Sequence, residues 1–105
     1  MNCKPGDIAR IVKDSFPQNQ QRLVQVTGAC TDQYDIKMLT KFFGSSTDWW
    51  ECTALQTIML HDVMASGIIG AWEIRAGETC LFKDGNLRPL PGELNIEQFD
   101  LEATA

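Results

Sequence analysis

Hydrophobic residues in the first quarter of the chain recur at the short spacing of β-strands. Residues 8–13 are rich in β-branched side chains and follow a Pro-Gly-Asp turn. A polar stretch, 14–21, separates them from residues 22–27, in which Val24 and Val26 share one face. The pattern predicts two antiparallel strands joined by a loop, with both valines facing the core.

The segment 31–47 has a different spacing. Leu39, Phe42 and Phe43 recur at helical intervals, and Gly44 follows them at the place where a helix commonly ends. A short helix is therefore predicted here.

The next segment, 48–55, alternates again and contains two adjacent tryptophans. Trp50 shares its face with Cys52 and Ala54, whereas Trp49 lies on the opposite face. We therefore expect Trp50 to enter the core. Trp49 is then either exposed or covered by the preceding helical segment.

The second half of the chain consists of short apolar runs between turn signals. Residues 56–77 predict a long hairpin with an insertion, and a one-turn helix at 62–65 is the alternative. Residues 78–83 predict a strand, 84–86 a tight turn and 87–90 a short last strand.

Two interpretations fit the stretch Arg88-Pro89-Leu90-Pro91. A polyproline ligand for another protein needs the PxxP spacing, which is incomplete here. A strand of the protein's own sheet requires that the missing N–H of Pro89 fall at an edge or at an unpaired position. The second interpretation is preferred.

Short strands dominate and helical spacing is scarce, which favours a mainly β fold, either a small barrel or an open sandwich. The order of the predicted elements resembles an SH3-like barrel. The opening KPGDIARIV, followed by LVQV, is similar to KOW-type SH3-like domains, although residues 18–21 are Gln-Asn-Gln-Gln where that group usually carries glycine and basic residues. The resemblance implies a single SH3-like β-barrel domain over residues 1–91. The acidic residues that follow, 92–105, are expected to form a tail that is docked or disordered.

The whole pattern, with Pro-Gly-Asp near the start, a central Trp and a terminal Leu-Arg-Pro-Leu, looks most like small uncharacterised proteins encoded by bacteriophages and prophages. This resemblance implies a phage or prophage origin and no particular activity.

A length of 105 residues, of which 44% are hydrophobic and 22% charged, is typical of one globular domain. No apolar run is long enough to cross a membrane, and the first residues lack the features of a secretory signal. A cytoplasmic location is expected.

The formal net charge of -5 is concentrated at the C-terminus. Residues 92–105 contain four acidic residues and no Lys or Arg, so the rest of the chain is nearly neutral. Because nucleic-acid affinity comes mainly from basic side chains, a broad nucleic-acid surface is disfavoured.

Catalytic and metal-binding patterns are missing from the sequence. The four cysteines, Cys3, Cys30, Cys52 and Cys80, include no close pair of the kind that zinc sites use, so reduced thiols are expected. His61 is followed directly by Asp62, and neighbours in a strand point to opposite faces, so His61 is interpreted as a partly exposed loop residue. The sequence predicts a protein that is not an enzyme and that has no cofactor.

The leading hypothesis is a module that works by protein contact, with an unknown partner, through aromatic residues Tyr34, Trp49 and Trp72. A second hypothesis is weak RNA or DNA binding along a basic strip, Lys4, Arg10, Lys13 and Arg22. A third is a phage structural or assembly component that associates with itself.

Overall fold

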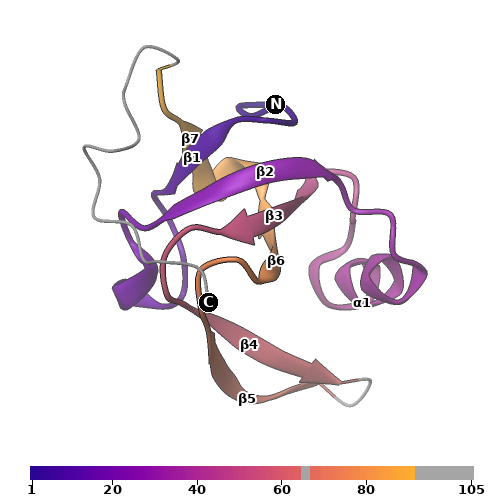
Figure 1. Ribbon diagram of the computed structural model, residues 1–105. Coiled ribbons are helices and arrows are strands. Elements are labelled where there is room, and N and C mark those ends of the chain that lie inside the picture. Colours follow the sequence, from indigo (N-terminus) through magenta and orange to yellow (C-terminus); the bar gives the residue numbers. More distant parts are fainter. Residues whose placement is uncertain (65–66, 92–105) are drawn as a thin grey trace.

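The computed structural model describes residues 1–64 and 67–91 and shows a mainly β fold (Figure 1). Its strands are β1 (Ile8–Ile11), β2 (Leu23–Ala29), β3 (Trp49–Ala54), β4 (Ile58–Met64), β5 (Gly67–Ile74), β6 (Thr79–Lys83) and β7 (Leu87–Pro89). One α-helix, α1 (Gln33–Phe43), and two 3-10 turns, η1 (Pro17–Asn19) and η2 (Asp84–Asn86), complete the described elements.

Five strands form one antiparallel sheet in the order β6-β3-β2-β1-β7, and β4 pairs with β5 in a separate ribbon. The sheet is not closed, so the predicted barrel is not confirmed. The physical reason is that a barrel needs a partner on both sides of every strand, whereas in the described part of the chain β6 pairs with β3 alone and β7 with β1 alone.

The core lies on one face of this sheet. The residues that face it are the alternating ones that the sequence predicted. Val24 and Val26 are fully buried, and Trp50 is only 7% exposed. The predicted inward face of the tryptophan strand is therefore confirmed. The buried cluster consists of Cys3, Ala9, Ile11, Val24, Val26, Trp50, Cys52, Ala54, Ile58, Ile74, Cys80, Phe82 and Leu87.

The last strand, β7, confirms the interpretation of the Leu-Arg-Pro segment as part of the sheet. Pro89 lies opposite Ala9 on an edge strand. The bonds from Leu90 N–H to Ile8 C=O (2.8 Å) and from Val12 N–H to Asn86 C=O (2.9 Å) flank this pair. Because bonded and non-bonded pairs alternate, the missing N–H of Pro89 falls where no bond to β1 is needed.

Helix α1 begins and ends at the residues that its local chemistry favours. The side chain of Asp32 accepts a hydrogen bond from Asp35 N–H (3.0 Å), and Gly44 ends the helix with a φ of 86°. The predicted helix is confirmed. Its Phe43 ring packs against Trp49, with 5.0 Å between ring centroids, so the helix partly covers that indole.

The predicted hairpin is confirmed as β4–β5, and residues 62–64 are extended, so the helical alternative is wrong for them; Ala65 lies outside the described residues. Ile58 and Ile74, at the base of the ribbon, are buried in the main core. Asn19 is fully buried and binds Met59 twice, through Met59 N–H (2.7 Å) and Met59 C=O (2.8 Å). These contacts fix the ribbon against the sheet.

The predicted acidic tail, 92–105, lies outside the described residues. Among the helices that the structure describes, none has the length and apolar character needed to span a bilayer.

A buried carboxylate, Asp84, connects the N-terminal residues to Trp50 of β3. It accepts hydrogen bonds from Asn2 N–H (2.6 Å), Cys3 N–H (2.9 Å) and the Trp50 indole N–H (2.8 Å). Burial alone would raise the pKa of Asp84, but the bonds from Asn2, Trp50 and Cys3 outweigh burial and hold it below its ordinary value.

Replacing Asp84 by Asn is expected to lower the free energy of unfolding by about 1–3 kcal/mol at pH 7, because charge-assisted bonds to buried donors are lost. Urea unfolding followed by Trp fluorescence measures this. Asp48→Asn, which removes an exposed ion pair to Lys83, is the control and should change stability by less than about 1 kcal/mol.

The pH dependence gives a second readout of the same substitution. The pKa of Asp84 is lower in the folded state than in the unfolded state. The contribution of the ionised carboxylate to the free energy of unfolding is therefore fully present above the unfolded pKa of about 3.9, and it is lost as pH falls through the folded pKa. The stabilities of wild type and Asp84→Asn should converge in acid. A difference that stays constant from pH 7 to pH 2 would contradict this role.

Candidate functional site

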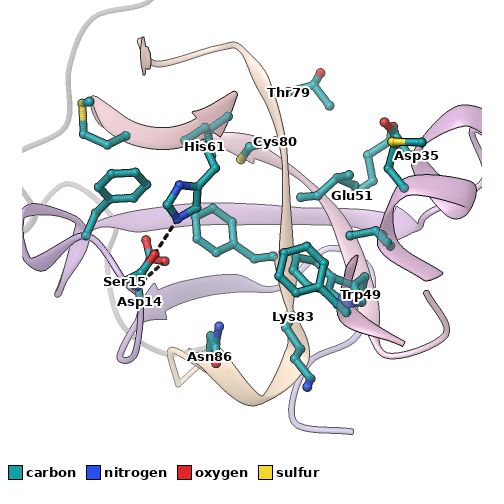
Figure 2. Close-up of a pocket in the computed structure, with 18 of the residues that line it drawn as sticks. Asp14, Ser15, Asp35, Trp49, Glu51, His61, Thr79, Cys80, Lys83 and Asn86 are labelled. Carbon is teal, nitrogen blue, oxygen red and sulfur yellow. Dashed lines mark hydrogen bonds between the residues drawn. The ribbon is translucent and has the colours of Figure 1, made fainter. Parts of the chain in front are cut away.

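A groove of roughly 780 Å³ runs along β6 and separates α1 from the β4–β5 ribbon (Figure 2). Figure 2 shows Asp35, Glu51 and Trp49 on one side of β6 and His61 and Ser15 on the other. The lining residues are Asp14, Ser15, Phe16, Tyr34, Asp35, Met38, Leu39, Phe43, Trp49, Glu51, Met59, Leu60, His61, Trp72, Thr79, Cys80, Leu81, Phe82, Lys83 and Asn86.

The wall on the helix side is aromatic. Tyr34 is 57% exposed and Phe43 is 49% exposed, although both are large apolar side chains. Trp49 lies against Phe43 on the outer face of β3, where strand alternation places it because Trp50 fills the core.

The wall on the ribbon side is also largely apolar. Trp72 of β5 is 53% exposed, and its Cα partner on β4 is Leu60. Phe16 packs against His61 with 4.4 Å between ring centroids. The position of this wall depends on the Asn19 contacts that hold β4, because these bind the ribbon to the loop before β2.

Among the residues whose side chains the structure describes, exposed large hydrophobic side chains are concentrated at the groove. Among the described residues four large hydrophobic side chains are exposed, and three of them line it: Tyr34, Phe43 and Trp72. The structure thus brings together Tyr34, Trp49 and Trp72, which the sequence analysis named as one patch. Phe43 was expected only as a cover for Trp49, and its own exposure was missed.

Of the three described acidic residues that line the groove, Asp35 and Glu51 lie at its helix side and Asp14 lies beside Ser15 at the ribbon side (Figure 2). Burial, together with the nearby carboxylates of Asp32 and Glu51, raises the pKa of Asp35. Among the described lining residues Lys83 is the one Lys or Arg, and its Nζ lies 3.6 Å from Asp48. The positive charge of Lys83 is therefore paired with Asp48, which does not line the groove.

A polar contact between Ser15 and His61 lies at the ribbon side, with 2.7 Å between Ser15 Oγ and His61 Nε2. His61 is an exposed residue of β4 rather than a loop residue, so the sequence interpretation of its location is corrected. The sequence analysis considered only Asp62 as a neighbour of His61. It missed Ser15, because Ser15 and His61 are 46 positions apart.

The proposed basic strip lies on and around the β1–β2 pair, and none of its side chains lines the groove. Lys4 is paired with Asp7 at 3.2 Å. Arg10 lies opposite Arg88 of β7. Lys13 follows β1, and Arg22 precedes β2. The structure does not join these residues to the aromatic patch.

The cysteines are free thiols, three of them buried. Burial, assisted by the nearby Asp84, raises the pKa of Cys3 to about 11, and burial together with Cys3 raises that of Cys52 to about 12. Burial also raises the pKa of Cys80. Within residues 1–64 and 67–91 no group of His, Cys, Asp or Glu is arranged to hold a metal ion.

Comparison of the chain with protein-family models, with curated proteins and with solved structures found no match. The functional argument therefore depends on the groove itself.

Native protein exposed to iodoacetamide at pH 8 should be alkylated first at Cys30, because it is the partly accessible thiol and the other three are buried in the sheet core. Peptide mapping by mass spectrometry measures this. Labelling of Cys3, Cys52 and Cys80 should be at least about tenfold slower in native protein and should reach completion in urea.

The Cys30→Ser variant is the control and should take up almost no label in the native state. Equal labelling rates at Cys30 and Cys52 would contradict the described core.

Proposed function

We propose that this protein is a non-enzymatic module that binds a segment of a partner protein in the groove along β6. The observation that carries the proposal is the placement of three exposed large apolar side chains, Tyr34, Phe43 and Trp72, around one concave surface. Exposed apolar side chains that gather in this way commonly mark interaction sites.

The size and lining of the groove suit a short peptide segment. A volume near 780 Å³ is within the range of ligand sites, about 300–1,000 Å³. Trp and Tyr are enriched among the residues that contribute most to binding energy at protein interfaces. The aromatic residues therefore supply the affinity, and the polar residues between them supply orientation.

We further propose that the sheet is an opened relative of the SH3-like barrel and that the protein is cytoplasmic and of phage or prophage origin. The sequence resemblance of the β1–β2 segment supports the first point. The strand order along β7-β1-β2-β3-β6 is compatible with it.

A structural role rather than catalysis is proposed for the Ser15–His61 pair. Both side chains are exposed, so water competes for their hydrogen bond. A serine nucleophile with a histidine base usually has a third group that orients the imidazole. Among the described residues His61 has the Ser15 contact and the Phe16 ring contact. The pair is therefore assigned to holding the ribbon beside the loop.

Trp72→Ala is expected to weaken peptide binding at least about tenfold, because an exposed indole is removed from the ribbon-side wall of the groove. Peptides selected from a random display library against the wild-type protein are the probes, and their dissociation constants are measured by fluorescence anisotropy. Since Trp72 is half exposed, its removal should change the free energy of unfolding by less than about 1 kcal/mol.

Trp72→Phe should recover part of the affinity, and Gln25→Ala, on a strand away from the groove, is the matched control. The proposal fails if no peptide is enriched, or if the enriched peptides bind Trp72→Ala as tightly as wild type.

A further inference from the structure

Strand β6 forms one edge of the sheet, and the groove follows it along its full length. All five of its residues line the groove. In the described part of the chain its partner is β3, with Trp50 opposite Phe82 and Cys52 opposite Cys80. An edge strand of this kind has a row of backbone groups that are free to pair with another strand.

The hydrogen-bond pattern shows which backbone groups of β6 face outward. The bonds Asp84 N–H to Asp48 C=O (2.8 Å) and Ala54 N–H to Glu78 C=O (2.9 Å) bracket the strand. Bonded pairs alternate along an antiparallel ladder, so the even-numbered residues of β6 bond to β3.

It follows that Thr79, Leu81 and Lys83 direct their N–H and C=O groups away from β3. In residues 1–64 and 67–91, no other strand pairs with this side of β6. Leu81, at the centre of the strand, is half-buried and lines the groove. Its backbone offers one donor and one acceptor in the middle of the groove.

The two walls differ in the carboxylates that are available to a ligand. On the helix side the carboxylates of Asp35 and Glu51 line the groove, and among the described residues neither forms an ion pair. On the ribbon side Leu60 and Trp72 line it together with Asp14, whose carboxylate accepts hydrogen bonds from Ser15 N–H (2.8 Å) and from the Asn19 side chain. Side chains of an added strand alternate between its two faces, so one set would meet the acidic wall and the other the apolar wall.

We propose that an extended segment of a partner protein, alternating basic and apolar residues, pairs with the open edge of β6 as a sixth strand of the sheet. The Arg or Lys side chains lie toward Asp35 and Glu51, and the apolar ones toward Leu60 and Trp72. Backbone hydrogen bonds to Leu81 fix the register of the added strand relative to β6, as in other complexes that form by strand addition. The proposal rests on the proposed function and specifies its binding mode and the chemistry of the partner.

Charge argues against two other occupants. The segment 93–102 of this chain carries four acidic residues and no basic ones, so it would meet Asp35 and Glu51 with like charge. A second copy paired edge to edge along β6 would bring two copies of the same acidic wall to one interface. Both arrangements are disfavoured by like-charge repulsion.

The test uses full-length protein and four synthetic probes: the heptapeptide RLRLRLR, its neutral counterpart QLQLQLQ, the block isomer RRRRLLL, and the peptide ELNIEQFDLE of residues 93–102. The alternating basic peptide should bind about threefold to tenfold more tightly than each of the others at low ionic strength. At saturation it should slow hydrogen exchange of the Leu81 amide at least about tenfold. N-methylation of the peptide amides that face β6 should abolish binding, and N-methylation of the intervening ones should not.

The double variant Asp35→Asn with Glu51→Gln should reduce the ratio of the basic to the neutral affinity to about one. Glu73→Gln removes one negative charge from β5, outside the groove lining, and should leave the ratio unchanged. Trp72→Ala should weaken the basic and the neutral peptide alike. Far-ultraviolet circular dichroism confirms that each variant is folded.

The outcomes separate this inference from the proposed function. If library peptides bind through Trp72 while the Leu81 amide stays unprotected, or the double variant keeps the basic preference, the groove binds proteins but strand addition by a basic segment is wrong. Tighter binding of the 93–102 peptide, or a dimer whose dilution exposes Leu81, assigns the edge to the chain itself and also overturns the inference. If none of the probes and no library peptide binds, both proposals fail.

Discussion

The carboxylate of Asp84 accepts three hydrogen bonds from groups that are distant in the sequence: the backbone of Asn2, the backbone of Cys3 and the indole of Trp50. A buried carboxylate is costly unless donors replace the water it loses, and here three donors do so. The backbone N–H of Asp84 also bonds to Asp48, immediately before β3. Asp84 therefore holds the N-terminal residues against the core and fixes the end of β6 against β3.

This constraint also positions the candidate site. With Trp50 held in the core by Asp84, strand alternation directs Trp49 and Glu51 to the opposite face, where α1 and the groove lie. The other wall is positioned independently, through the bonds of Asn19 to Met59 and the burial of Ile58 and Ile74. The groove thus lies between two walls that are each anchored to the core.

Part of the site was predictable from the sequence and part was not. Parity along residues 48–55 identified Trp50 as a core residue and Trp49 as an outer one, because a period of two leaves no alternative for adjacent residues. The contact of Ser15 with His61 and the nearness of Asp35 to Glu51 were not predictable, since each joins residues from separate elements. The expectation of a closed barrel was not confirmed: β6 and β7 are the two edges of the sheet in the described residues, and no local sequence pattern specifies whether two such edges pair.

By itself the sequence indicated most of the strands, the end of α1, the buried faces of β2 and β3, and that Pro89 must lie at an edge or at an unpaired position. These features follow from periodicity, from glycine at a positive φ and from the missing N–H of proline, all of which act within a few residues. The tertiary structure alone decided that β6 is an edge and that Tyr34, Trp49 and Trp72 surround one groove beside it. The reason is that these arrangements arise from long-range contacts made by Asp84, Asn19 and the hairpin base, whose partners are set by packing in three dimensions.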